Sequence, residues 1–74
     1  MTTDEAIKAA EEIRPPGCIF KMWGPTLTPG RRYIVFVEQF KDYSSTVLCL
    51  GFGPSVAEAY ESVAIELAGF QNAT

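Results

Sequence analysis

The last third of the chain holds the feature that most limits how the chain can fold: an amphipathic helix with a clearly marked beginning. Ser55 and Glu58 have the spacing of a capping box, in which the side chain of each residue accepts a hydrogen bond from the backbone amide of the other. On the opposite side of the expected helix we place Glu58, Glu61 and Ser62. Apolar residues recur at the helical period and form one broad stripe that a sheet or a second helix must cover: Val56, Ala59, Tyr60, Val63, Ala64, Leu67 and Phe70.

Three segments before this helix have the character of strands. Cys18 to Trp23 alternates, and Tyr33 to Phe40 is apolar on both of its faces up to Glu38. Thr46 to Phe52 follows, with Leu48, Leu50 and Phe52 expected on one face and Val47 and Cys49 on the other, before an expected glycine hinge at 51–54. Because the connections between the strands are short, we predict an antiparallel meander; parallel neighbours would require long crossovers.

A first helix precedes the strands. Thr2 or Thr3 can cap it, and Pro15 is expected to end it at Arg14. The predicted fold class is therefore α+β: a three-stranded antiparallel sheet with two helices on one face, in the order α-β-β-β-α. The 74 residues, 1–74, are expected to form a single domain.

This order of elements resembles the double-stranded-RNA-binding domain, and the resemblance implies the same arrangement of helices and strands. That family carries a lysine cluster between its third strand and its last helix, where this chain has Pro54-Ser55-Val56-Ala57-Glu58, so the resemblance implies the fold without the main RNA contact. A strand hairpin followed by Gly51, Gly53, Ser55, Glu58 and Ala59 is also similar to short bacteriophage and prophage accessory proteins, and more loosely to HicB-type antitoxins. This second resemblance implies a protein that acts by binding.

The sequence gives little support to catalysis or to cofactor binding. Cys18 and Cys49 do not supply the four ligands of a zinc site, and the chain contains no histidine. The same lack of histidine leaves Ser55 without a base to activate it. Gly51-Phe52-Gly53 lacks the third glycine of a dinucleotide fingerprint and the lysine of a P-loop. We therefore expect no enzyme activity, no catalytic residue, no metal site and no cofactor, and we expect both cysteines to be buried free thiols.

The longest apolar run, Tyr33 to Val37, is far shorter than the roughly 20 residues of a membrane-spanning helix. The acidic start of the chain does not resemble a signal peptide. We therefore expect no membrane association and a cytoplasmic protein, in the host cytoplasm if a phage encodes it.

The leading functional hypothesis is a non-enzymatic protein-binding module, either a phage accessory protein or an inhibitor that engages a host protein. One predicted surface is the outer face of the last helix, where Glu58, Glu61 and Ile65 would suit a basic partner such as a nucleic-acid-binding host protein. A second predicted surface is the sheet face away from the helices. Because the central strand is apolar on both sides, we expect that face to be covered by a partner or by a second copy of the chain, which would form a homodimer.

The alternative hypothesis is a nucleic-acid-binding domain. In that case Lys21, Arg31 and Arg32 would contact phosphates while a neighbouring aromatic side chain stacks on a base. The acidic helices and a sequence pI near 4.7 disfavour this alternative, because the patch would have to act against net repulsion.

Overall fold

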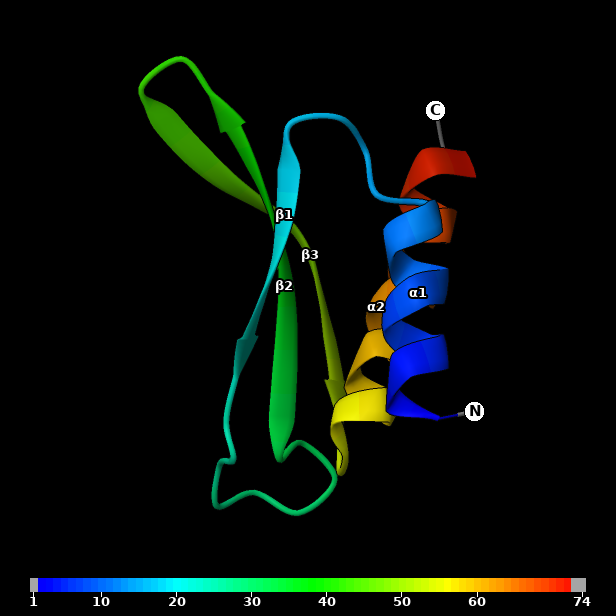
Figure 1. The fold of residues 1–74 in the computed structure, drawn as a ribbon. Coiled ribbons are helices and arrows are strands. Elements are labelled where there is room, and N and C mark those ends of the chain that lie inside the picture. The colour runs from blue at the N-terminus through cyan, green and yellow to red at the C-terminus, as the bar shows by residue number, and fades with distance from the viewer. Residues whose placement is uncertain (1, 73–74) are drawn as a thin grey trace.

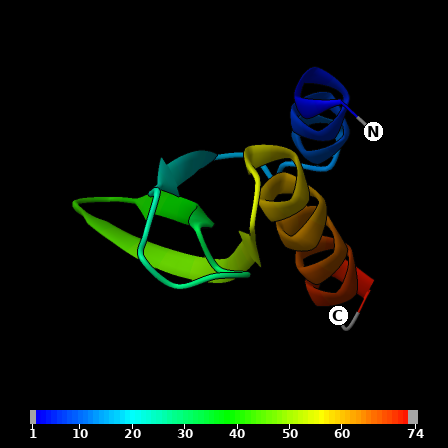
Figure 2. The ribbon, with the colours of Figure 1, turned by 90° about the horizontal axis from the view of Figure 1, so that it is seen from below.

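The computed structural model describes residues 2–72, and its elements follow the order α-β-β-β-α (Figure 1). The strands form one antiparallel sheet in the order β1-β2-β3. Both helices lie on the same side of this sheet (Figures 1 and 2), so the predicted fold class is confirmed. The elements are α1 (Thr3–Glu12), β1 (Cys18–Trp23), β2 (Tyr33–Lys41), β3 (Ser44–Gly53) and α2 (Val56–Asn72).

The two ends of α1 have separate causes. At its start Thr2 forms a complete capping box: the Thr2 hydroxyl accepts from the Glu5 amide at 3.2 Å, and the Glu5 carboxylate accepts from the Thr2 amide at 3.0 Å. These hydrogen bonds lower the pKa of the Glu5 carboxyl group. Thr2 is thus the cap, and Thr3 is the first helical residue. The helix ends at Glu12, slightly before the predicted Arg14.

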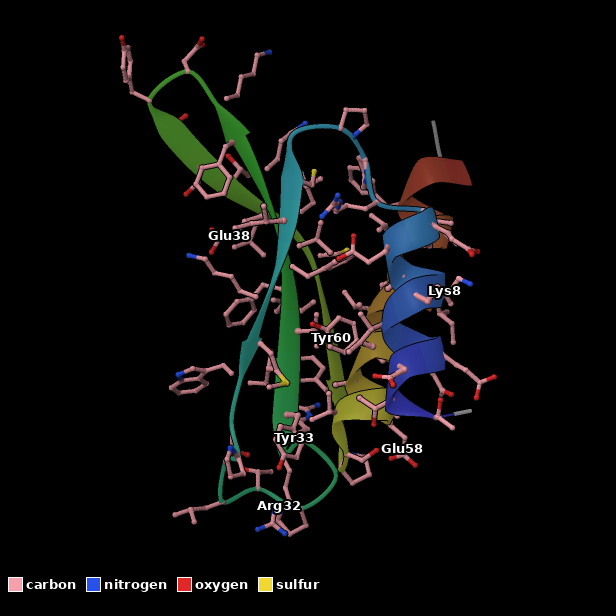
Figure 3. All side chains as sticks on the ribbon, viewed as in Figure 1. Lys8, Arg32, Tyr33, Glu38, Glu58 and Tyr60 are labelled. Carbon is pink, nitrogen blue, oxygen red and sulfur yellow. The ribbon has the colours of Figure 1, made fainter. Side chains whose placement is uncertain are left out.

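The core lies between α2 and the inner face of the sheet, the face that the helices cover. Ala59, Val63 and Leu67 of α2 are fully buried, as are Val35 and Val37 of β2. Beside them the ring of Tyr60, which points between the helices and the sheet (Figure 3), meets the edge of Phe20 with the ring centroids 6.0 Å apart. The helix α1 packs along α2 and buries Ala6 and Ala10.

The predicted stripe of α2 is correct in its middle and wrong at its end. Phe70 is 46% exposed, because the β2–β3 hairpin has bent away from the helices at that level (Figure 1). Ser62, expected to face solvent, instead accepts a hydrogen bond from the Phe52 amide at 3.3 Å. The helix lies close enough to β3 for a residue at the border of the stripe to reach the strand.

Two glycines explain this close approach, and the predicted hinge is wrong. Gly51 and Gly53 both belong to β3, and a side chain at either position would point toward α2. A Cβ atom at Gly51 would overlap the backbone nitrogen of Val63, and one at Gly53 would lie 2.5 Å from the backbone nitrogen of Ala59. The absence of side chains at these two positions lets the helix backbone rest directly on the strand.

A β-bulge in β3 corrects the predicted faces of that strand. Val37 pairs with Cys49 and Glu38 pairs with Val47, so Leu48 has no partner on β2. One extra residue reverses the alternation that follows it. Val47 therefore lies on the same face as Leu50, whereas Leu48 packs against the core. Beyond the bulge the hairpin turns at Asp42, which has a positive φ of 58°.

The two cysteines are free thiols, as predicted, with Cys18 buried and Cys49 partly buried. Within residues 2–72, neither helix combines the length and the apolar character that crossing a membrane requires.

Candidate interaction surface on the outer face of the sheet

The side of the sheet that faces away from the helices presents a regular grid of side chains, three from each strand. The strand registers place them in three rows, each row taking one residue from β1, β2 and β3 in turn. We call these nine residues the outer face. From the hairpin end to the opposite end, the rows are Ile19, Glu38 and Val47, then Lys21, Phe36 and Leu50, then Trp23, Ile34 and Phe52.

Seven of these nine positions are apolar, and several are open to solvent. Trp23 is 64% exposed, Val47 is 49% exposed and Leu50 is 40% exposed. Phe40 continues the same face toward the hairpin tip and is 49% exposed. A sheet with one solvated face normally alternates between apolar residues inside and polar residues outside. This sheet does not alternate in that way, because its outer face is largely apolar and partly exposed to solvent.

The two charged side chains of the outer face form a pair. Lys21 Nζ lies 3.4 Å from Glu38 Oε2, and the Glu38 side chain is only 15% exposed. Glu38 points to the side of the sheet opposite the helices, as Figure 3 shows. Because the two charges compensate each other, the centre of the outer face is electrically neutral.

At the end of the outer face near the β1–β2 loop, cationic side chains form a rim. The guanidinium carbon of Arg31 lies 5.0 Å from the centroid of the Phe52 ring, a cation–π contact that partly covers the ring. Arg32 lies in the loop (Figure 3), where it helps to line a hollow together with Leu27 and Pro54.

The loop itself, residues 24–32, is held in shape by hydrogen bonds of Thr26. The Thr26 amide donates to the Arg32 carbonyl at 2.7 Å, and the Thr26 hydroxyl donates to the Arg31 carbonyl at 2.8 Å. A second hollow lies between Trp23, Pro25 and Leu27, and Leu27 is fully exposed. The apolar surface therefore continues from the outer face onto this loop.

The α2 residues predicted from the sequence to bind a protein do not lie on the outer face. Glu58 and Ile65 are exposed on α2, Ile65 at 72%, while Glu61 is partly buried. Glu58 lies on the helix side of the molecule and Glu38 on the sheet side (Figure 3). The binding role of Glu58, Glu61 and Ile65 stays a prediction, and they form a surface distinct from the outer face.

The three basic residues of the alternative hypothesis are distributed along the sheet side. Lys21 belongs to the middle row, Arg31 covers Phe52 in the last row, and Arg32 lies beyond the grid in the loop. Sequence reasoning anticipated an apolar outer face from the two apolar sides of β2, but it missed Val47, because a bulge leaves no mark in the pattern of apolar residues.

Comparison with known proteins supplies no further indication. No family model, no curated protein and no solved structure matches this chain.

Proposed function

We propose that this chain is a protein-binding module and that the outer face of the sheet is its binding surface. The observation that carries the proposal is the seven apolar side chains gathered on a sheet face that neither helix covers. Contiguous apolar patches of this kind on small domains are typical of protein interaction sites. The narrower interpretation, an accessory protein or inhibitor directed at a host protein, rests on the resemblance to bacteriophage proteins.

The composition of the outer face supports a protein partner. Trp23 and Phe36 are of the aromatic type enriched at interface centres, and the aliphatic Ile34 and Leu50 lie beside them. The Lys21–Glu38 pair provides a polar contact that can fix the orientation of a partner.

A second candidate function is single-stranded nucleic-acid binding. The observation in its favour is that Arg31 and Lys21 lie on the same side of the sheet as Trp23 and Phe52, and aromatic side chains with basic neighbours are a stacking platform for bases. Against it, Phe52 is already in contact with Arg31, and the chain carries a net charge of −3.

A capture experiment with matched variants tests the proposed function. Tagged protein would be incubated, with and without nuclease treatment, with a lysate of bacteria that also produce the untagged chain. Bacteria are the source that the bacteriophage resemblance suggests, and the untagged chain allows a second copy to be captured as well. The wild-type protein, Leu50→Lys on the outer face and Ile65→Asp on α2 would be compared. Both substitutions place a charge at an exposed apolar residue, so they differ mainly in which surface they alter.

We expect nuclease-resistant capture by the wild-type protein and by Ile65→Asp, and loss of capture by Leu50→Lys. Equal capture by Leu50→Lys would overturn the proposed function. If Ile65→Asp alone loses capture, the binding surface is the α2 face with Glu58 and Glu61. Capture that nuclease abolishes would favour the nucleic-acid candidate.

A further inference from the structure

We infer that the protein bound by the outer face is a second copy of this chain, packed sheet against sheet as a twofold dimer. This inference rests on the proposed function, because it names the partner of the same surface. The resulting assembly would have four layers, with helices on the outside and two sheets back to back in the middle.

The size of the surface agrees with a dimer interface. Five apolar side chains on this side of the sheet are well exposed: Ile19, Trp23, Val47, Leu50 and Phe40. Since a large apolar side chain presents about 150 to 250 Å² when fully exposed, the exposed fractions of these five together amount to roughly 500 Å². The partly exposed Ile34, Phe36 and Phe52 and the Arg31 side chain add to this area. A standard interface buries about 800 Å² on each partner, so one such face against another comes close to what a specific dimer requires.

The charges of the outer face are complementary to the same face on another copy. A twofold axis along the diagonal through Ile19, Phe36 and Phe52 exchanges the places of Lys21 and Glu38 in the grid. Two copies related by this axis cross their strands steeply, toward the orthogonal arrangement in which sheets can pack. Each Lys21 would then face Glu38 of the second copy as well as its own, which gives a neutral ring of four charges.

The modest core supplies a further reason for self-association. Among the side chains described for residues 2–70, the buried set comprises Ala6, Ala10, Cys18, Val35, Val37, Ala59, Val63 and Leu67, with no aromatic side chain. Larger apolar side chains such as Trp23 and Phe36 lie on the outer face. Small domains commonly gain stability by oligomerisation, and here a second copy would bring these larger side chains into a common core.

Other occupants agree less well with the charges. A nucleic-acid backbone requires a surplus of positive charge, whereas the nine residues of the outer face include one lysine and one glutamate, and the cationic rim with Arg31 lies at one end only. A highly acidic or basic protein would likewise find no net charge on the outer face. A second copy presents the same neutral apolar grid and therefore matches it.

Analytical ultracentrifugation between about 1 µM and about 1 mM tests the inference, since this range covers weak to moderate dimers. Trp23, the only tryptophan of the chain, provides an independent signal. Its emission should shift to shorter wavelength and its quenching by acrylamide should fall as the dimer forms, because the side chain passes from solvent into the interface.

Charge exchange between two variants gives the sharpest test. A copy with Lys21→Glu presents two carboxylates on the outer face, and a copy with Glu38→Lys presents two ammonium groups. Each variant alone should dimerise at least about tenfold more weakly than the wild-type chain, while an equimolar mixture should recover most of the affinity. Circular dichroism checks that both variants are folded, and Ile65→Asp is the control expected to dimerise normally.

Three outcomes would overturn the inference. The first is a wild-type chain that stays monomeric over the whole range, and the second is a dimer that Leu50→Lys and both charge variants leave unchanged. The third is salt-sensitive quenching of Trp23 by a single-stranded oligonucleotide that Arg31→Ala abolishes, because the occupant would then be nucleic acid. If the chain is monomeric yet Leu50→Lys still loses lysate proteins in the capture experiment, only the second-copy inference fails. If Leu50→Lys captures them normally, the proposed function fails as well.

Discussion

The inner and outer faces of the sheet are built from the same three strands and are both apolar, yet only one of them receives the helices. Along β3 the inner positions are small, Gly51 and Gly53, while the alternate outer positions are large, Leu50 and Phe52. The helix backbone can approach the glycines until a Cβ atom would collide with it. The same approach is impossible over leucine and phenylalanine side chains.

Along β3, side-chain size rather than hydrophobicity distinguishes the face that α2 occupies. The two glycines of β3 on the inner face allow close packing of helix on strand, with Ala59 and Val63 seated directly above Gly53 and Gly51. Large residues on the other face leave a broad apolar surface suited to contact with side chains of another molecule.

The strongest test adds a methyl group where α2 rests on β3. Gly51→Ala should destabilise the fold by about 3 kcal/mol or more, because the new methyl group collides with the backbone of α2, which cannot move like a flexible side chain. Gly69→Ala is the matched control: nothing lies within 4 Å of a Cβ atom there. Since glycine is unfavourable within a helix, that control should be stabilised by about 0.5 kcal/mol.

Urea unfolding followed by circular dichroism measures both variants. A small loss of stability for Gly51→Ala, similar in size to ordinary surface substitutions, would show that α2 does not rest on β3 as described. The size rule for choosing a face would then be wrong.

The second test removes one leucine from each face. Leu67 is fully buried beneath the sheet, so Leu67→Ala should cost about 2 to 5 kcal/mol. Leu50 is 40% exposed, so Leu50→Ala should cost about 1 kcal/mol or less in the monomer.

Protein concentration separates the two leucines further. If the outer face is buried in a dimer, the destabilisation caused by Leu50→Ala should grow with protein concentration. The destabilisation caused by Leu67→Ala should stay constant, because Leu67 lies in the core of a single chain. Thermal unfolding at two protein concentrations provides the measurement. Costs of equal size at low concentration would show that the two faces are buried to a similar degree within one chain.

The main features of the fold could be predicted because local signals and the overall pattern agree. Pro15 and the loop glycines separate the elements, and the period changes from helix to strand where the structure changes. Cys18–Trp23 was predicted with its bounds, and the apolar outer face followed from the two apolar sides of β2.

Other features depend on contacts between distant residues, and the sequence carries either no local signal for them or one that permits two interpretations. The bulge at Leu48 arises from pairing with β2, so alternation alone placed Val47 on the wrong face. Gly51 and Gly53 were interpreted as a hinge, although their spacing of two residues within a strand also predicts a face that another backbone can approach. The position of Ser62 beside Phe52 follows from that close approach.

Cys49 and Leu50 are neighbouring positions on β3 that face opposite ways. Burial raises the pKa of the Cys49 thiol, and the nearby Glu66 carboxylate and Cys18 act in the same direction. A thiol introduced as Leu50→Cys would lie on the outer face in contact with solvent. We therefore expect its pKa to be close to the ordinary value of about 8.5, below that of Cys49.

Alkylation rates measured against pH, at concentrations low enough to keep the chain monomeric, compare the two thiols. Cys18→Ala would be present in both proteins and Cys49→Ala in the Leu50→Cys protein, so that each has a single thiol. Cys49 should reach half of its maximal rate at the higher pH.

The raised pKa of Cys49 also makes the stability of the fold depend on pH, because a raised pKa means that the folded chain favours the neutral thiol. The stability gained from that preference is present below the ordinary thiol pKa, and it is lost as the pH rises through the folded value. The unfolding free energy of the single-thiol Cys49 protein should therefore fall between those two pH values more steeply than that of a protein carrying both Cys18→Ala and Cys49→Ala. If both thiols titrate at the same pH, the inner face near Cys49 is no drier than the outer face, and the contrast between the two faces does not extend to this end of β3.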